Sequence, residues 1–403
     1  MGYIGKTPTP AALTASDITD GIVTSAKIAD GTIATADIAD SAVTKAKTTG
    51  ITSDPFRNLC INGDMSISQR GTSTTGVTTT DGYYACDRWY TQTDTGTWTI
   101  SQSNNVPTGQ GYYKSLKLDC TTAGTSNADE VSIRHKIEGQ NVQYLKFGTS
   151  NASSLTVSFW IKSNKTGTYS LSMVNSNSTQ ERIASFNYTI SSADTWEKKT
   201  ITFPGDTARA FDNTNGEELT LYWWFSAASG FTSGGVQNTW TNYSANYHAD
   251  SGLAGLGGST DDNLFLTGVQ LEAGTSASDF EFLPFDINLR RCHRYFCTTD
   301  TVGGTQAGYP ARAFSSSGLS FSAPLPVPMR SAPSVTLVGT LRAFAGDTAT
   351  YRDSTSSLSV GAYTNLNSSM IGLQSTGFSG ITDNKAYNIM SINDTQIKYD
   401  SEL

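Results

Sequence analysis

Six aromatic side chains occupy positions away from the expected hydrophobic core, where a flat ring can pack against the face of a sugar. Trp160 shares the polar face of a predicted strand with Lys162, and Tyr222 and Trp224 lie opposite the apolar residues of a second predicted strand. The other three occur in a Gly- and Asn-rich stretch typical of a loop, namely Trp240, Tyr243 and Tyr247. Aromatic residues in such positions contact a ligand, join two chains or form a second core layer. The sequence leaves these three roles open.

The sequence contains none of the short patterns that mark a serine hydrolase or a zinc protease. It has only three histidines, and neither Gly-x-Ser-x-Gly nor His-Glu-x-x-His occurs. Glycoside hydrolysis requires two carboxylates on either side of the scissile bond. The adjacent pair Glu217 and Glu218 would point to opposite faces of a strand. We therefore expect no catalytic residues, with a glycan depolymerase as the enzymatic alternative.

The composition is typical of a folded chain with many short strands. Charged residues make up 15% and aromatic residues 10% of the 403 residues, which is unlike a disordered chain. The net charge of −8 opposes binding to the phosphates of nucleic acid. No apolar run is long enough to span a bilayer, so we expect no membrane insertion. An odd number of cysteines indicates buried free thiols, at Cys60, Cys86, Cys120, Cys292 and Cys297.

A five-residue repeat occupies the N-terminal part, and its period fits neither a helix nor a flat strand. A repeat this short cannot bury a core within one chain. We therefore expect copies from three chains to wind together as a stalk, with a low-complexity linker as the alternative. The apolar members that would line the shared axis are Ile18, Val23, Ile28, Ile33, Ile38 and Val43.

Alternating apolar residues predict a series of strands between residues 56 and 285. The runs 155–161 and 219–225 each place four large side chains on one face. A shorter alternation marks 198–203, and the run 264–271 is interrupted by Gly268, which indicates a bulge or close packing. Many short strands separated by turn residues predict a β-sandwich, and we favour a jelly roll.

Ordered motifs at both ends of this region resemble a domain found in many bacteriophage tail-fibre proteins. The opening motifs are Asn58-Leu-Cys-Ile-Asn-Gly-Asp-Met65, Ser68-Gln-Arg-Gly71 and Tyr84-Ala-Cys-Asp-Arg-Trp-Tyr90. The closing motifs are Thr267-Gly-Val-Gln-Leu-Glu-Ala-Gly274, Phe280-Glu-Phe-Leu-Pro284 and Leu289-Arg-Arg-Cys-His-Arg-Tyr-Phe296. The N-terminal repeat is similar to the N-terminal segments of marine phage tail fibres. The resemblance implies a jelly roll similar to carbohydrate-binding modules.

The same resemblance implies a virion protein that is made in the host cytoplasm without a signal peptide. Its N-terminus would attach to tail or virion adaptor proteins, and it would bind a host cell-surface glycan during adsorption. Sugar-binding jelly rolls often carry a structural Ca²⁺, for which Asp64, Asp261 and Asp262 are candidate ligands. No other cofactor is expected. The alternatives are a purely structural head fibre, decoration or connector protein and, less favoured, a depolymerase tailspike.

Together these observations predict an all-β protein that assembles as an elongated homotrimer. Residues 1–54 would form the attachment segment and repeat stalk, and residues 55–296 the jelly-roll, carbohydrate-binding-like domain. Residues 297–403 would form a smaller β-sandwich at the tip, in which we predict strands at 334–338 and 397–403 after a proline-dense approach.

Overall fold

The computed structural model describes residues 14, 23–24, 28, 33, 37–38, 56–176, 179–300, 309–345, 351–354, 358–362 and 369–403. The chain divides into two compact units, Met1–Ser53 and Asp54–Leu403. In the first unit, the repeat residues Val23, Ile28, Ile33 and Ile38 are exposed in the single chain. The repeat residues Ile18 and Val43 lie outside the described residues. Assembly into a trimeric stalk stays a prediction.

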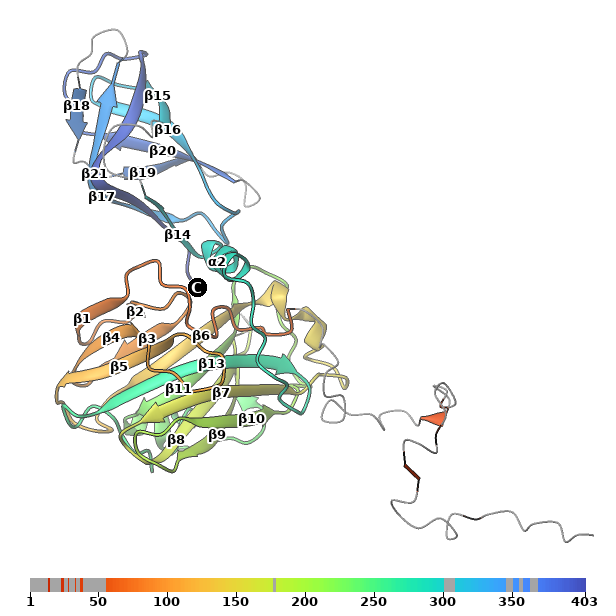
Figure 1. Ribbon diagram of the computed structural model, residues 1–403. Helices are drawn as coiled ribbons and strands as arrows, with labels where there is room; N and C mark the ends of the chain where they lie inside the picture. Colours follow the sequence, from red (N-terminus) through yellow and green to blue (C-terminus); the bar gives the residue numbers. More distant parts are fainter. Residues whose placement is uncertain are drawn as a thin grey trace, which may run out of the picture. The chain divides into compact units, whose positions relative to one another are not determined.

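Two antiparallel sheets form the central domain, and their strands come from distant parts of the sequence (Figure 1). The first sheet has the order β1 (Ser73–Val77), β4 (Thr97–Ser103), β5 (Ser115–Thr122), β13 (Asn263–Ala273), β7 (Leu155–Ser163) and β10 (Glu197–Phe203). The second has the order β12 (Thr241–Asn242), β9 (Arg182–Ile190), β8 (Gly167–Asn175), β11 (Glu217–Ser226), β6 (Val131–Glu138), β3 (Tyr90–Thr93) and β2 (Gly82–Tyr83). This arrangement confirms the predicted all-β class.

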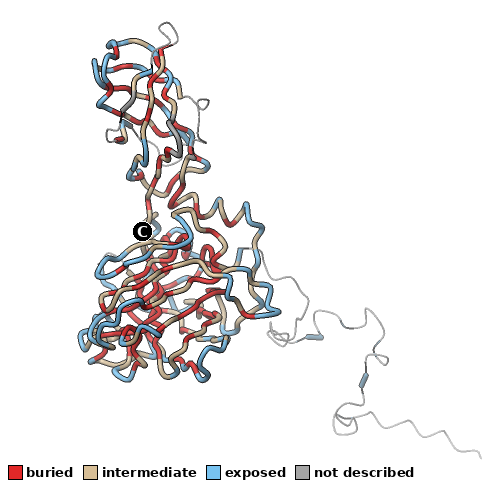
Figure 2. The backbone as a smooth tube through the Cα atoms, turned by 60° about the vertical axis from the view of Figure 1, so that its left-hand side comes forward, coloured by how far each residue is buried: buried red, intermediate tan, exposed pale blue. Residues whose placement is uncertain are grey.

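The two sheets bury the apolar faces that the alternation of β7 and β11 predicted. On β7, the core face consists of Leu155, Val157, Phe159 and Ile161, all fully buried. The matching face of β11 includes Trp223, whose ring meets Phe159 edge-on with centroids 5.8 Å apart. Aromatic pairs with this edge-to-face geometry stabilise a core beyond the apolar area that they bury. Figure 2 shows buried residues gathered in the interior of this domain, with exposed residues toward its periphery.

The glycine in β13 marks a bulge, as the sequence predicted. The register of β13 against β7 shifts between Thr267 and Gln270, and Gly268 lies there with a φ of 61°. A Cβ at this position would stand 2.6 Å from the hydroxyl oxygen of Tyr112. Both the left-handed backbone and the close ring therefore require glycine.

The described strands of the C-terminal domain form one antiparallel sheet with its own hydrophobic core. Its order is β18 (Tyr351–Ser354), β17 (Ser334–Phe344), β21 (Ala386–Asp400), β15 (Tyr309–Ala313), β16 (Gly318–Pro324), β20 (Met370–Thr376) and β19 (Leu358–Ala362), and β14 (Phe296–Asp300) pairs with β21. The predicted strand at 334–338 falls within β17, and only residues 397–400 of the predicted strand 397–403 are strand, at the end of β21. Residues 401–403 follow the last strand.

These last residues contact the central domain through a buried ion pair. Glu402 accepts a hydrogen bond from Arg88, which is fully buried and stacks on the Tyr295 ring at 3.5 Å. Arg70 lies 3.3 Å from the other oxygen of Glu402. Arg330 donates to the backbone oxygens of Ser401 and Glu402. The segment after β21 is therefore held by charge-assisted hydrogen bonds.

The described helices are all short. They are α1 (Ser229–Thr232), α2 (Phe285–His293) and the 3-10 helices η5 (Gly139–Asn141), η6 (Gln143–Leu145) and η7 (Ala245–Tyr247). In the part of the chain that the structure describes, no helix has the length and apolar character needed to cross a membrane. All five cysteines are buried and free, which confirms their interpretation as buried thiols.

Candidate functional site

The opening and closing motifs of the central domain meet in space, and Asn58 joins them. Its Oδ1 accepts hydrogen bonds from the backbone N–H groups of Cys60 and Leu271, at 3.0 and 3.1 Å. Its Nδ2 donates to the backbone oxygen of Val269 at 3.0 Å. Gly63 lies so close to the same strand that a Cβ would stand 2.1 Å from Val269 O. The opening segment is thereby fixed along β13.

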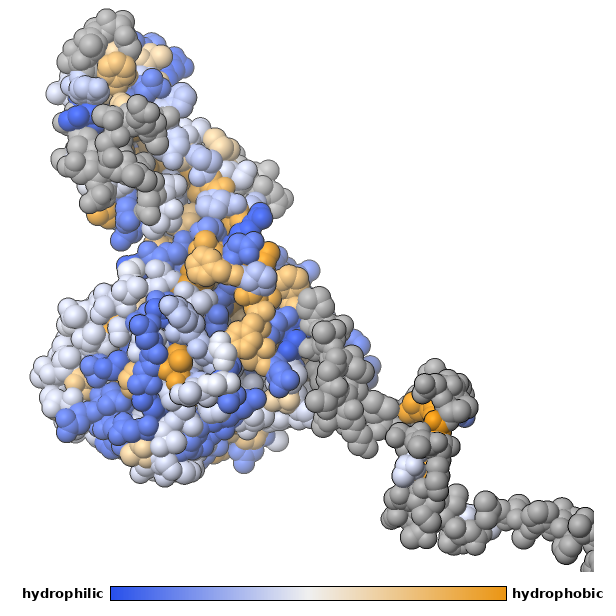
Figure 3. Space-filling view, viewed as in Figure 1, coloured by the Kyte–Doolittle hydropathy of each residue, from blue (hydrophilic) through white to orange (hydrophobic). Residues whose placement is uncertain are grey.

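Helix α2 packs on the same opening segment. The backbone N–H of Asn62 donates to Asn288 Oδ1 at 3.2 Å, and Arg291 donates to the backbone oxygen of Asn58 at 3.1 Å. Cys292 of the helix packs with Ile61, Ile67 and Tyr295 in a small core. Figure 3 shows hydrophobic side chains gathered over α2 on the otherwise largely hydrophilic surface. The helix therefore sets the position of its arginines relative to the opening segment.

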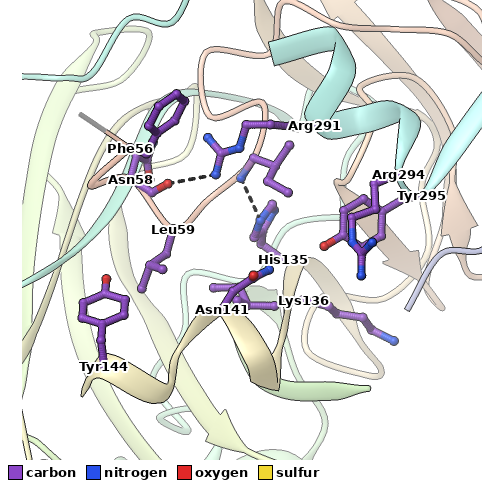
Figure 4. Close-up of a pocket in the computed structure, with 12 residues that line it drawn as sticks. Phe56, Asn58, Leu59, His135, Lys136, Asn141, Tyr144, Arg291, Arg294 and Tyr295 are labelled. Atoms are coloured by element: carbon purple, nitrogen blue, oxygen red, sulfur yellow. Dashed lines mark hydrogen bonds between the residues drawn. The ribbon is translucent and has the colours of Figure 1, made fainter. Parts of the chain in front are cut away.

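A pocket of about 340 Å³ opens between this segment, β6, the η5–η6 turn and the end of α2. We call it the Arg291 pocket, and Figure 4 shows the residues that line it. Its volume lies at the lower end of the range for small-ligand sites. The lining consists of Phe56, Asn58, Leu59, Ile61, His135, Lys136, Ile137, Asn141, Tyr144, Arg291, Arg294 and Tyr295.

Two exposed aromatic rings belong to the lining, Phe56 at 59% and Tyr144 at 53%. Tyr144 faces outward because its neighbours in the turn, Val142 and Leu145, are fully buried in the main core. At Gly139 the turn packs closely against the segment that contains Asp212, and a Cβ there would stand 2.0 Å from the backbone oxygen of Asp212. The local sequence thus presents a tyrosine ring to solvent on a firmly packed turn.

The polar groups at the inner side of the pocket have fixed roles. His135 accepts a hydrogen bond from the Ile61 N–H at 3.2 Å, and burial holds the pKa of His135 well below its usual value, so the ring is neutral. Arg294 forms two hydrogen bonds of 2.7 Å with Glu138, and Lys136 pairs with Glu217 at 2.9 Å. These partners hold the ring and the two cations in place.

The lining of the pocket combines aromatic rings with polar and basic groups. No Asp or Glu is among its lining residues, so the pocket does not supply the two carboxylates of glycoside hydrolysis. A neutral, buried His135 provides no proton near neutral pH. What remains are two aromatic faces, the amide of Asn141, the hydroxyl of Tyr144 and the guanidinium of Arg291.

Three of the aromatic residues singled out in the sequence gather around His248 on the outer face of the second sheet. Its ring lies 4.8 Å from Tyr222, 4.9 Å from Trp224 and 5.6 Å from Tyr243. Trp224 is only 1% exposed and belongs to a second core layer with Ala227, Ala249 and Leu253. Trp224 is shielded from solvent because the segment from α1 to Leu253 covers this part of the sheet. Of the three roles considered for it, Trp224 therefore has that of a second core layer.

The other candidates are scattered. Trp240 is buried in the main core, with its Nε1–H donating to Pro204 O at 2.6 Å. Tyr247 is half-buried in η7 against Gly234. Trp160 is half-buried on the other sheet. The guanidinium of Arg134 covers the Tyr222 ring at 4.8 Å, which leaves Tyr243 as the exposed ring of the His248 group.

The three aspartates expected at a structural Ca²⁺ are not assembled into a ligand set. Asp262 Oδ2 accepts backbone N–H groups of the 257–259 turn, at 2.8 to 3.2 Å. Asp64 Oδ1 accepts from Ser66 and Asn288 instead, while Asp261 is exposed. Within the described residues, no three His, Cys, Asp or Glu side chains are placed to hold a metal ion.

Sequence reasoning did not single out Phe56, Tyr144 or Arg291 as binding residues. Phe56 and Arg291 lie beside or within the opening and closing motifs, and Tyr144 lies far from both in the sequence. The sequence feature that could have indicated these residues is the occurrence of polar and charged residues inside otherwise apolar motifs, such as the two arginines after Leu289.

No protein-family model and no curated protein matches this chain. Solved structures with a similar fold include a putative sugar-binding protein from Bacteroides thetaiotaomicron, 12% identical, which covers 54% of this chain and 99% of its own, with a TM-score of 0.30. Another is the CBM22-2 xylan-binding domain of Paenibacillus barcinonensis Xyn10C, 13% identical, with coverages of 46% and 91% and a TM-score of 0.27. The enzymatically active domain of bacteriophage CBA120 tailspike protein 4 is 12% identical, and the match covers 55% of this chain but only 22% of the tailspike, with a TM-score of 0.28. These values are too low to transfer a ligand or an activity.

Proposed function

We propose that this chain is a fibre component of a bacteriophage particle that binds a host-surface glycan in the Arg291 pocket. The observation that carries the binding role is an open pocket of about 340 Å³ whose lining combines two exposed aromatic rings with polar donors. Phe56 and Tyr144 offer flat apolar surfaces to a sugar ring. Asn141 and Arg291 offer N–H groups to its hydroxyls.

The fibre role is supported by sequence features outside the pocket. The N-terminal repeat leaves apolar residues exposed in a single chain, which favours association with further copies. The ordered motifs resemble those of phage tail fibres, and they form the wall of the pocket. A fibre that binds without cleaving is consistent with a lining free of carboxylates.

A pair of tyrosine variants tests the binding role. Purified full-length protein is titrated with host cells and applied to a glycan microarray. Tyr144→Ala should weaken binding at least tenfold, which corresponds to about 1.4 kcal/mol. Tyr113→Ala is the matched control, because Tyr113 is 76% exposed and lines none of the pocket. Equal binding by wild type and Tyr144→Ala, or no binding by either, would reject the pocket as a glycan site.

Labelling of intact particles tests the fibre role. Antibody raised against the purified chain should decorate tail fibres in electron micrographs, and free protein should compete with phage adsorption. Decoration of the head without competition would favour the alternative of a structural head fibre.

A further inference from the structure

Arg291 lacks the carboxylate partner that six other arginines of the described residues possess. Within the described residues it forms no ion pair and donates one hydrogen bond, to the backbone oxygen of Asn58. Arg209 and Arg330 also form no ion pair there, but Arg330 donates to three backbone oxygens, and Arg209, which donates to Gln180 O, lines none of the pocket. Six arginines form ion pairs with Asp or Glu, namely Arg57, Arg70, Arg88, Arg134, Arg182 and Arg294.

The surroundings of Arg291 remove water without supplying a negative charge at contact distance. Burial lowers the pKa of Arg291, because desolvation disfavours the charged guanidinium. The nearby carboxylate of Glu281 is engaged by the backbone N–H groups of Phe56 and Asn58. A guanidinium has five N–H donors, so most of those of Arg291 remain for a ligand.

The other cations of the lining are already neutralised. Figure 4 shows Lys136 directed away from Arg291, toward the carboxylate of Glu217. Arg294 forms two hydrogen bonds with Glu138. In a chain with 35 acidic and 27 basic residues, this lining contains three cations and no carboxylate. Arg291 is therefore the charge that a bound anion would meet.

We propose that the Arg291 pocket binds a saccharide that carries an anionic substituent, a carboxylate, sulfate or phosphate, held by Arg291. This inference rests on the proposed glycan-binding function and adds the chemical class of the ligand. Two N–H groups of a guanidinium donate in parallel to two oxygens of such a group. The anion would supply the direct, hydrogen-bonded negative partner that Glu281, which attracts Arg291 without pairing with it, does not provide. Phe56 and Tyr144 pack against the sugar ring that bears it.

Matched sugar pairs test the proposal by isothermal titration of the full-length protein. The carboxylate arm compares trigalacturonate with its methyl ester, and sialyllactose with lactose. Sulfate and phosphate arms compare sulfated and phosphorylated lactose with lactose. At least one anionic member should bind tenfold or more tightly than its neutral partner. Arg291→Gln should abolish this preference, so that the anionic and neutral members of each pair bind within about twofold of each other.

Arg290→Gln is the control, because Arg290 is the exposed neighbour on α2 and lies outside the pocket. It removes the same charge and should keep the preference. Arg291→Lys keeps the charge but loses the parallel donors, so it should retain part of the preference even if Arg291→Gln melts early. No tighter binding of any anionic member would overturn the inference. Binding of neutral sugars alone would leave the glycan-binding function intact, whereas failure to bind host cells or any sugar would end both.

Discussion

Removal of the Glu402 charge should destabilise the central domain, although Glu402 lies beyond the last strand of the C-terminal domain. Its partner Arg88 is fully buried, and the Glu402 side chain is 6% exposed. Taking one member from a buried ion pair leaves an uncompensated charge, which costs about 3–5 kcal/mol. Arg88 keeps its stacking on Tyr295 and a hydrogen bond to Lys136 O. We therefore expect the lower value, about 3 kcal/mol, for Glu402→Gln.

Tryptophan fluorescence during guanidinium unfolding measures this effect, because all seven tryptophans lie in the central domain. In thermal melts the same loss corresponds to a decrease in Tm of about 6–12 °C. Asp400→Asn is the matched control, since Asp400 pairs with Arg70 but its side chain is 41% exposed. A pair with such a partner contributes about 1 kcal/mol or less.

A double variant separates the ion pair from simple loss of packing. Arg88→Met with Glu402→Leu replaces both charges by apolar groups, and such replacements are often neutral or stabilising. We expect it to recover most of the stability that Glu402→Gln loses. If Glu402→Gln unfolds at the wild-type midpoint, the buried charge of Arg88 is compensated elsewhere and the reasoning fails.

Three further predictions concern pH, packing and assembly. Burial raises the pKa of Asp87 to about 6 from 3.8, so between pH 6 and 4 the folded protein holds a proton that the unfolded chain releases. Lowering the pH through this window should therefore increase the free energy of unfolding of the wild type relative to that of Asp87→Asn. An equal change of the two free energies with pH would contradict this prediction. Gly63→Ala should cost at least about 1–3 kcal/mol in chemical unfolding, because its Cβ meets Val269 O, whereas Gly230→Ala, with open space around it, should change little. Full-length protein should show the mass of three chains by light scattering, and Ile28→Asp with Ile38→Asp should reduce it to one; a monomeric wild type would refute the stalk.

The strands of the central domain were predictable where one face of the strand packs against the core. Alternation over 155–161 identified the fully buried face of β7, and Gly268 identified the bulge of β13. Alternation does not show whether the opposite face is covered. Trp224 is enclosed by a segment that follows its strand, so its position on the outer face was correct but its exposure was not predictable.

The pocket could not be predicted from the sequence because its parts are joined only by tertiary contacts. Phe56, Tyr144 and Arg291 come from a loop, a 3-10 turn and a nine-residue helix. The helix is too short for its periodicity to be informative. The lack of a carboxylate contact at Arg291 could not be predicted either. The chain has more acidic than basic residues, so only the fold determines which arginine is left without a carboxylate partner.

The junction of the opening segment with β13 and α2 has a mechanical consequence. The chain enters the central domain at Phe56 and leaves it after Tyr295, and the bonds from Asn58 to Val269 and from Arg291 to Asn58 tie these two ends together. Tension applied between the two ends would load this short set of hydrogen bonds, one of which ends on β13 of the sandwich. Tension along the chain would then strain the wall of the Arg291 pocket, so that force along the chain and occupancy of the pocket are coupled.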